Sequence, residues 1–206
     1  MLQPTIIENA SSDQIADWLA ERLGQKLESR AGPVTITVPG GSTPFPILQR
    51  LVERELPMDR LVVWPNDDRA VPEDHEASNT GKIRRLLEPA GAEVVTLSIM
   101  EQVPRFDLAW LGMGEDGHIA SLFPSSDPRV DDPQAVRRIT PDPLPPEAPY
   151  DRITLTLPAL LNSDELVFVI RGEDKRQVFN HALTDEGDLP VARLLRAAAQ
   201  PVTCFT

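Results

Sequence analysis

The sequence has 206 residues, 41% of them hydrophobic and 25% charged, which predicts one globular domain rather than a disordered chain. Its formal net charge of −12 disfavours binding to the phosphates of nucleic acid or to an anionic membrane surface. The single cysteine excludes an internal disulfide. The sequence shows no leader pattern, and no apolar run approaches the roughly 20 residues that span a bilayer. We therefore expect a cytoplasmic protein.

The first half of the chain alternates between strand and helix patterns. A short apolar segment at 5–9 precedes residues 11–30, where apolar side chains recur at helical spacing and Ser11 or Ser12 can cap the start. The next segments are, in chain order, a β-branched strand at 34–41, a helix with proline in its first turn at 43–56, a buried strand at 60–64 and a helix at 78–89.

The second half continues the alternation around one unusual stretch. Residues 124–150 are rich in proline, and we expect a surface excursion within a single domain spanning 1–206. The other segments are, in order, strands at 92–99 and 106–113, a possible helix start at 118–123, strands within 152–162 and 165–172 joined by a short helical turn, helices at 173–183 and 189–198, and a strand at 201–205. This order predicts an α/β fold with a mostly parallel sheet flanked by helices on both faces.

Polar residues gather where these strands end, and in an open α/β sheet ligands bind outside the carboxyl ends of strands. The segment "VPGGSTP" (38–44) forms the end of the strand at 34–41 and the turn after it. Gly40 and Gly41 permit a tight turn with exposed N–H groups, and Ser42 and Thr43 add hydroxyls before a helix, so the turn can hold a phosphate. The alternative is an ordinary strand–helix turn that Ser or Thr caps.

Two more strand ends carry charged or glycine-rich segments. Asp67, Asp68 and Arg69 follow the strand at 60–64, and an arginine there can hold a carboxylate or phosphate with two hydrogen bonds. The segment "LGMGEDGHIASLFP" (111–124) begins at the end of the strand at 106–113 and presents His118 on a glycine-rich turn, which favours a functional histidine. Its glycines also match G-x-G-x-x-G, but no acid-tipped strand follows, so a dinucleotide site is not expected.

Taken together, "GGSTP", "DDRAVPEDHEASN", "FDLAWLGMGEDGHIASLFP", "RITLTLPALLN" and "GEDKRQV" resemble the 6-phosphogluconolactonases, in the same order and over nearly the whole chain. The resemblance implies a Rossmann-like fold and hydrolysis of 6-phosphogluconolactone to 6-phosphogluconate, in the oxidative pentose phosphate or Entner–Doudoroff route. It also implies a reaction without metal or organic cofactor. The expected partner is this small sugar-phosphate lactone, and the expected assembly a monomer or homodimer.

Glucosamine-6-phosphate deaminase is the nearest alternative, since it shares "GGST" and a "DGHIA" segment. Ile119 is more typical of the deaminases, and Asp68 stands where the lactonases usually have glutamate. In the deaminases a catalytic glutamate lies five residues after the histidine. This chain has Phe123 there, and a phenyl ring cannot relay a proton, which favours simple hydrolysis. A third reading is a sugar-phosphate-binding regulator without activity, and retention of His118 counts against it.

Lactone hydrolysis assigns expected roles to these residues. A neutral histidine accepts a proton from water, which makes His118 the candidate general base. Asp116 or Asp67 can orient its ring, and Arg69 or the N–H groups of the glycine turns can stabilise the oxyanion. The resemblance implies that Arg152 and Lys175 hold the phosphate, with Arg171 a weaker alternative. No metal is expected, because spacing typical of ligands is missing among His75, His118, His181 and Cys204.

Overall fold

The computed structural model describes residues 3–146, 148–184 and 187–206 of the chain. A seven-stranded parallel sheet runs through the molecule in the order β1-β10-β9-β6-β2-β3-β5. Its strands are β1 (Thr5–Ile7), β2 (Val34–Val38), β3 (Leu61–Pro65), β5 (Glu93–Val94), β6 (Leu108–Leu111), β9 (Leu166–Val169) and β10 (Val202–Phe205). This is the parallel sheet that the alternation of strands and helices predicts.

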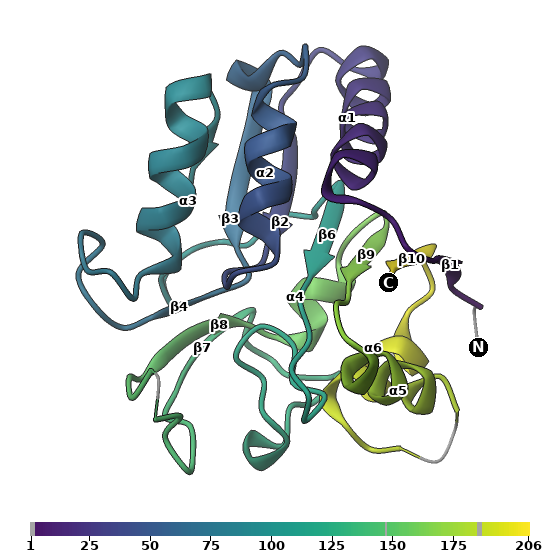
Figure 1. Cartoon of the computed structure of the whole chain (residues 1–206). Coiled ribbons are helices and arrows are strands. Elements are labelled where there is room, and N and C mark those ends of the chain that lie inside the picture. The colour runs from purple at the N-terminus through teal and green to yellow at the C-terminus, as the bar shows by residue number, and fades with distance from the viewer. Residues whose placement is uncertain (1–2, 147, 185–186) are drawn as a thin grey trace.

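The described residues form six α-helices. These helices cover the two faces of the sheet (Figure 1). The helices α1 (Ser12–Ser29), α2 (Pro44–Val52) and α3 (Asn79–Leu87) share one buried cluster with the sheet. The helices α4 (Leu157–Leu161), α5 (Glu173–Ala182) and α6 (Pro190–Ala197) contribute to the cluster on the other face. The expectation of helices on both faces is confirmed. Within the described residues, no helix is long and apolar enough to cross a bilayer.

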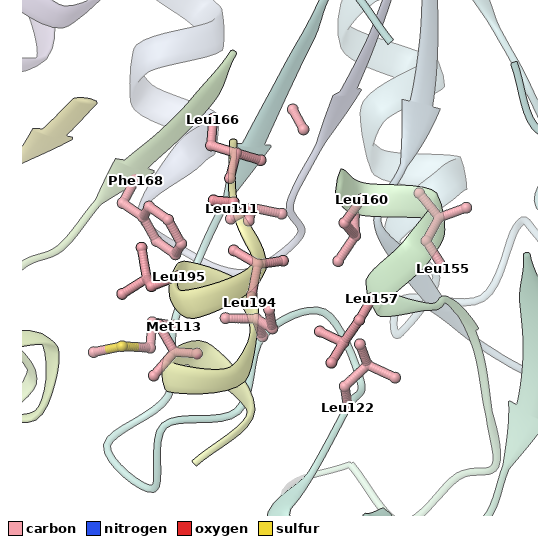
Figure 2. Packing of buried hydrophobic residues seen from close by; sticks show 14 of the residues in the cluster. Leu111, Met113, Leu122, Leu155, Leu157, Leu160, Leu166, Phe168, Leu194 and Leu195 are labelled. Carbon is pink, nitrogen blue, oxygen red and sulfur yellow. The ribbon is translucent and has the colours of Figure 1, made fainter. Parts of the chain in front are cut away.

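The central strand β6 shows why the strands of this sheet are continuous hydrophobic segments in the sequence. All four of its residues are buried. Because side chains alternate across a strand, Leu108 and Trp110 pack with the α1–α3 side, while Ala109 and Leu111 pack with the α4–α6 side. Figure 2 shows the second cluster, in which Leu111 packs with leucines of α4 and α6. A sheet covered on both faces therefore needs apolar residues at every position.

A second sheet of three antiparallel strands lies beyond the carboxyl end of β3. It consists of β4 (Asp67–Arg69), β8 (Arg152–Leu155) and β7 (Val136–Ile139), in the order β4-β8-β7. Its strand β4 continues from β3 after Asn66, whose N–H donates to the carbonyl of Val38 over 2.8 Å. The proline-rich stretch 124–150, expected as a surface excursion and described except at 147, contributes β7 to this sheet.

Three predicted elements differ from the structure. The helix start at 118–123 is wrong: Ala120 has a φ of 51°, which a right-handed helix does not allow, and Ile119 and Leu122 form a β-bridge instead. The strand expected at 92–99 is reduced to Glu93–Val94, which lies at the sheet edge and pairs only with β3. The helix expected at 43–56 ends at Val52. At the start of α1, Ser11 is the cap and exchanges hydrogen bonds with Gln14 in a capping box.

Candidate active site

A cleft of about 310 Å³ opens at the carboxyl ends of the central strands, between the large and the small sheet. Its wall is built from the turn after β2, the strand β4, the loop after β6, the start of β8 and the first turn of α5. The structure brings together in this wall nine of the residues expected from the sequence: Gly40, Gly41, Ser42, Thr43, Asp67, Arg69, His118, Arg152 and Lys175. Asp116 is not one of the lining residues, but it contacts His118.

The glycines before His118 are required by the shape of its turn. The N–H of Gly114 donates to the carbonyl of His118 over 2.9 Å, which closes the loop on itself. A Cβ on Gly114 would lie 2.2 Å from two atoms of the His118 ring. Gly117 has a φ of 76°, in the left-handed region that favours glycine. The imidazole therefore packs directly on the backbone of Gly114, and this contact fixes its position in the cleft.

His118 and Asp116 form a hydrogen-bonded pair. Nδ1 of His118 lies 2.5 Å from Oδ1 of Asp116, and the backbone N–H of His118 donates to the same oxygen over 3.2 Å. Partial burial opposes ionisation of Asp116, but the hydrogen bonds and charge of His118 outweigh it and hold the pKa of that carboxyl below its usual value. An ionised Asp116 places the ring proton on Nδ1. In the neutral imidazole, Nε2 is then left as a proton acceptor.

Phe123 lies beside the imidazole, with the two ring centroids 4.7 Å apart and the planes inclined by 40°. Phe123 also lines the cleft, so the position where a deaminase carries glutamate is an apolar wall in this chain. Leu122, the residue before it, points the other way and is buried in the core cluster with Leu157 and Leu160 (Figure 2).

Asp67 is a second, buried carboxyl in the wall of the cleft. Its side chain accepts hydrogen bonds from the hydroxyl of Ser121 and from Nδ2 of Asn79, the latter over 3.4 Å. Asn79 in turn packs on Gly40, because a Cβ on that glycine would lie 2.1 Å from the amide oxygen. Burial raises the pKa of Asp67 above its usual value, although the Ser121 hydrogen bond and the charge of Arg69 oppose the shift.

Asp68 points away from the cleft, since neighbouring side chains alternate along β4. Its carboxylate accepts hydrogen bonds from the hydroxyl of Ser78 over 3.0 Å and from the backbone N–H groups of Asn79 and Thr80 over 2.6 and 3.0 Å. These N–H groups belong to the first turn of α3, where a negative charge is favourable. The side chain that replaces the usual glutamate therefore anchors α3 to the small sheet.

Two arginines face each other on the small sheet. Arg69 on β4 lies directly opposite Arg152 on β8 in the strand register, and both line the cleft. Nη1 of Arg69 donates to the carbonyl of Ala77 over 2.8 Å, and Nη2 of Arg152 donates to that of Ala148 over 2.9 Å. Two guanidinium groups that line one part of the wall can hold an anion there with paired hydrogen bonds.

The loops that these arginines hold meet at the rim. The rings of His75 and Tyr150 contact each other edge to face, with centroids 5.5 Å apart. Nδ1 of His75 accepts a hydrogen bond from the N–H of Ala77 over 3.0 Å, and the carbonyl of Tyr150 accepts one from Arg152. The proline-rich stretch thus closes one side of the cleft, to which it contributes Pro145 and Ala148.

The turn after β2 supplies the remaining wall. Gly41 has a φ of 91°, and Thr43 precedes α2 without a capping hydrogen bond from its side chain, so the ordinary-cap alternative does not describe this turn. Lys175, in the first turn of α5, lines the same cleft. Arg171 lines it too, and its Nη2 donates to the carbonyl of Ala10 over 2.6 Å. Hydroxyls and cations are gathered here in a chain whose formal charge is −12.

Sequence reasoning missed three residues that the site uses. Asn79 and Ser121 hold Asp67, and both lie inside motifs that the sequence had singled out. Ala120 adopts the positive φ that turns Ser121 toward Asp67, and nothing in the residue type signals this. Within the described residues, no group of three or more His, Cys, Asp or Glu side chains is arranged to hold a metal ion.

Comparison with known proteins gives consistent matches over the whole fold. The sequence model of the family described as glucosamine-6-phosphate isomerases/6-phosphogluconolactonase matches residues 8–99 and 87–203. A 6-phosphogluconolactonase of Pseudomonas aeruginosa is 35% identical, over 91% of this chain and 89% of that protein. One of Thermotoga maritima is 30% identical, over 84% and 86% of the two chains.

Solved structures agree with the sequence matches. The crystal structure of a 6-phosphogluconolactonase from Thermotoga maritima has a TM-score of 0.84 at 24% identity and covers 98% of this chain and 99% of that one. One from Shewanella baltica has a TM-score of 0.83 at 27% identity, over 98% and 97%. The chain therefore belongs to the glucosamine-6-phosphate isomerase/6-phosphogluconolactonase family, in which it groups with the 6-phosphogluconolactonases.

Proposed function

We propose that this chain is a cytoplasmic enzyme of sugar-phosphate metabolism that hydrolyses 6-phospho-D-glucono-1,5-lactone to 6-phosphogluconate. One observation carries the choice of reaction: His118, paired with Asp116, lies in the cleft against the ring of Phe123. This gives a single positioned base without the neighbouring glutamate that sugar ring opening and deamination use. The relatives from Pseudomonas aeruginosa and Thermotoga maritima, both named 6-phosphogluconolactonase, support the same substrate.

The first step is attack of water on C1 of the lactone. Nε2 of His118 takes the proton of this water, while Asp116 holds the other ring nitrogen and stabilises the imidazolium that forms. Such positioned proton transfer contributes about 10²–10⁴-fold to a rate. Negative charge then develops on the carbonyl oxygen. Arg69, which lines the cleft opposite Arg152, is placed to stabilise this charge or the carboxylate of the product.

The phosphate is held by the turn at Gly40–Thr43 together with Lys175 and Arg152. In a protein of net charge −12, an anionic substrate needs cations concentrated at its site, and the cleft provides them. Lys175→Ala should raise KM far more for the phosphorylated lactone than for unphosphorylated gluconolactone. Lys175 is a cleaner test than Arg152, which also donates to the carbonyls of Ala148 and Tyr150.

The deciding experiment measures three activities of the same purified protein. Proton release from 6-phosphogluconolactone reports hydrolysis, ammonia release from glucosamine 6-phosphate reports deamination, and titration with 6-phosphogluconate reports binding alone. We expect proton release that His118→Asn reduces, and no ammonia. Ammonia release would show that the protein is a deaminase. Binding without turnover of either substrate would make it a sugar-phosphate-binding regulator.

A further inference from the structure

The buried carboxyl of Asp67 is not the acid that contacts the ring of His118. His118 uses Asp116 as its partner, so the role that the sequence left open between the two acids falls to Asp116. Asp67 is only 8% exposed, yet it lines the cleft. Ser121 and Asn79, which line the cleft beside it, donate hydrogen bonds to its carboxyl. A carboxyl held in this way, at the edge of a cleft that binds a sugar, is placed to act on the substrate itself.

The chain geometry fixes how far Asp67 can be from the base. His118 and Ser121 are three residues apart, and three residues span at most about 11 Å between their Cα atoms. The tight turn from Ile119 to Leu122, closed by the N–H of Leu122 on the carbonyl of Ile119 over 2.9 Å, brings them closer still. Ser121 contacts the carboxyl of Asp67 directly. His118 and Asp67 therefore border the same small region of the cleft.

Hydrolysis of a cyclic ester needs two proton transfers, each at an oxygen atom that bonds to the carbonyl carbon C1. Water loses a proton as it attacks C1, and the ring oxygen needs a proton as its bond to C1 breaks. Resting on the proposed function, we infer that Asp67 is the general acid that protonates the ring oxygen, while His118 serves as the base. Asp67 is thus assigned as a second catalytic residue, distinct from the carboxylate that orients the histidine.

The atoms balance as follows. Water adds its oxygen to C1 and its proton to Nε2 of His118, which leaves a tetrahedral intermediate with a negative oxygen. The carbonyl then reforms, the bond between C1 and the ring oxygen breaks, and the ring oxygen takes the proton of the Asp67 carboxyl. The imidazolium returns its proton to the Asp67 carboxylate through solvent. The new carboxylic acid of the product ionises and releases one proton.

The surroundings of Asp67 are consistent with a proton donor. Burial is the largest influence on its pKa and raises it, and the hydrogen bond from Ser121 is the largest opposing influence. Removal of that hydrogen bond leaves burial less opposed, so it raises the pKa further. The charged or titratable groups near Asp67 are Asp68 and Arg69 on its own strand, Arg152 on β8, and His118, Arg171 and Lys175, which line the same cleft.

The main test compares two leaving groups in wild type and Asp67→Asn. The amide keeps the shape of the carboxyl but cannot give up a proton. We expect kcat on the oxygen lactone to fall by about 10²-fold or more, with an unchanged melting temperature. An analogue with sulfur in place of the ring oxygen expels a thiolate, whose conjugate acid has a pKa of about 8.5 and needs no general acid. Asp67→Asn should therefore hydrolyse this thiolactone nearly as fast as wild type.

Two outcomes overturn the assignment: near-wild-type turnover of the oxygen lactone by Asp67→Asn, or an equal loss on both substrates. Ser121→Ala supplies a second readout, because it moves the falling limb of the pH–rate profile to higher pH if Asp67 acts as the acid. A limb that stays in place contradicts the role. If the wild type hydrolyses neither lactone, the proposed function fails instead, and that result is separate from both outcomes for Asp67.

Discussion

Gly114→Ala tests whether the position of His118, rather than its presence, determines the rate. A Cβ at this position would lie 2.2 Å from Cε1 and Nδ1 of the His118 ring and 2.6 Å from Oδ1 of Asp116. Ordinary contact begins at 3.4 Å, so the ring must move by at least the difference of 1.2 Å. A misplacement of about 1 Å can lower a rate by about 10²-fold. Because a side chain can swing aside at little cost in folding, the melting temperature should change far less than kcat.

The assay is kcat for lactone hydrolysis beside a thermal melt, with Gly112→Ala as the matched control. Gly112 lies two residues earlier in the same loop, where an added Cβ would meet only Pro39, at 3.4 Å. We expect Gly112→Ala to lose much less activity than Gly114→Ala. Wild-type kcat in a folded Gly114→Ala would refute the reasoning, because it would show that the imidazole tolerates displacement from the place that the turn gives it.

Three further substitutions test other parts of the site. Arg69→Lys should lose most of the activity, because an ammonium cannot both hold the carbonyl of Ala77 and present a planar fork to the substrate; equal activity would mean that charge alone matters. Phe123→Glu should shift the acidic limb of the pH–rate profile to higher pH, since a carboxylate beside the ring favours the imidazolium; an unshifted limb would show that the two side chains do not interact. For Asp116, the lowered pKa means that its contribution to stability is present above the usual 3.8 and is lost as pH falls through the folded-state value. Urea midpoints of wild type and Asp116→Asn should therefore converge at acid pH, and a constant gap would contradict the pairing with His118.

The elements that the sequence predicts well are those whose pattern is local. Helix α1 is readable because Ser11 and Gln14 form a capping box and apolar residues follow at helical spacing. Strand β4 is not readable, because Asp67, Asp68 and Arg69 have little strand propensity and become a strand only by pairing with β8. The same limit applies to β7, which a proline-rich stretch conceals.

The same distinction between local pattern and tertiary contact applies to the site. Its residue types were visible in the motifs, since glycine turns, a histidine and cations at strand ends each have a chemical reason to be there. The motifs did not show whether Asp67 or Asp116 is the partner of His118. Asp116 is close to His118 in the sequence, and Asp67 lines the same cleft in the fold. The choice depends on the hydrogen bond that closes Gly114 on His118 and on the positive φ of Ala120. Both are properties of the folded backbone.

The contact between His75 and Tyr150 gives this protein a built-in reporter. Tyr150 is the only tyrosine in the chain, so incorporation of fluorotyrosine yields a single ¹⁹F resonance without any engineered label. That ring lies against His75 at the point where two cleft-bordering loops meet, and its backbone carbonyl accepts from Arg152. Any ligand that draws Arg152 toward itself should change the environment of the fluorine. Occupancy of the cleft can then be followed by spectroscopy in the unmodified sequence, even with compounds that the enzyme does not turn over.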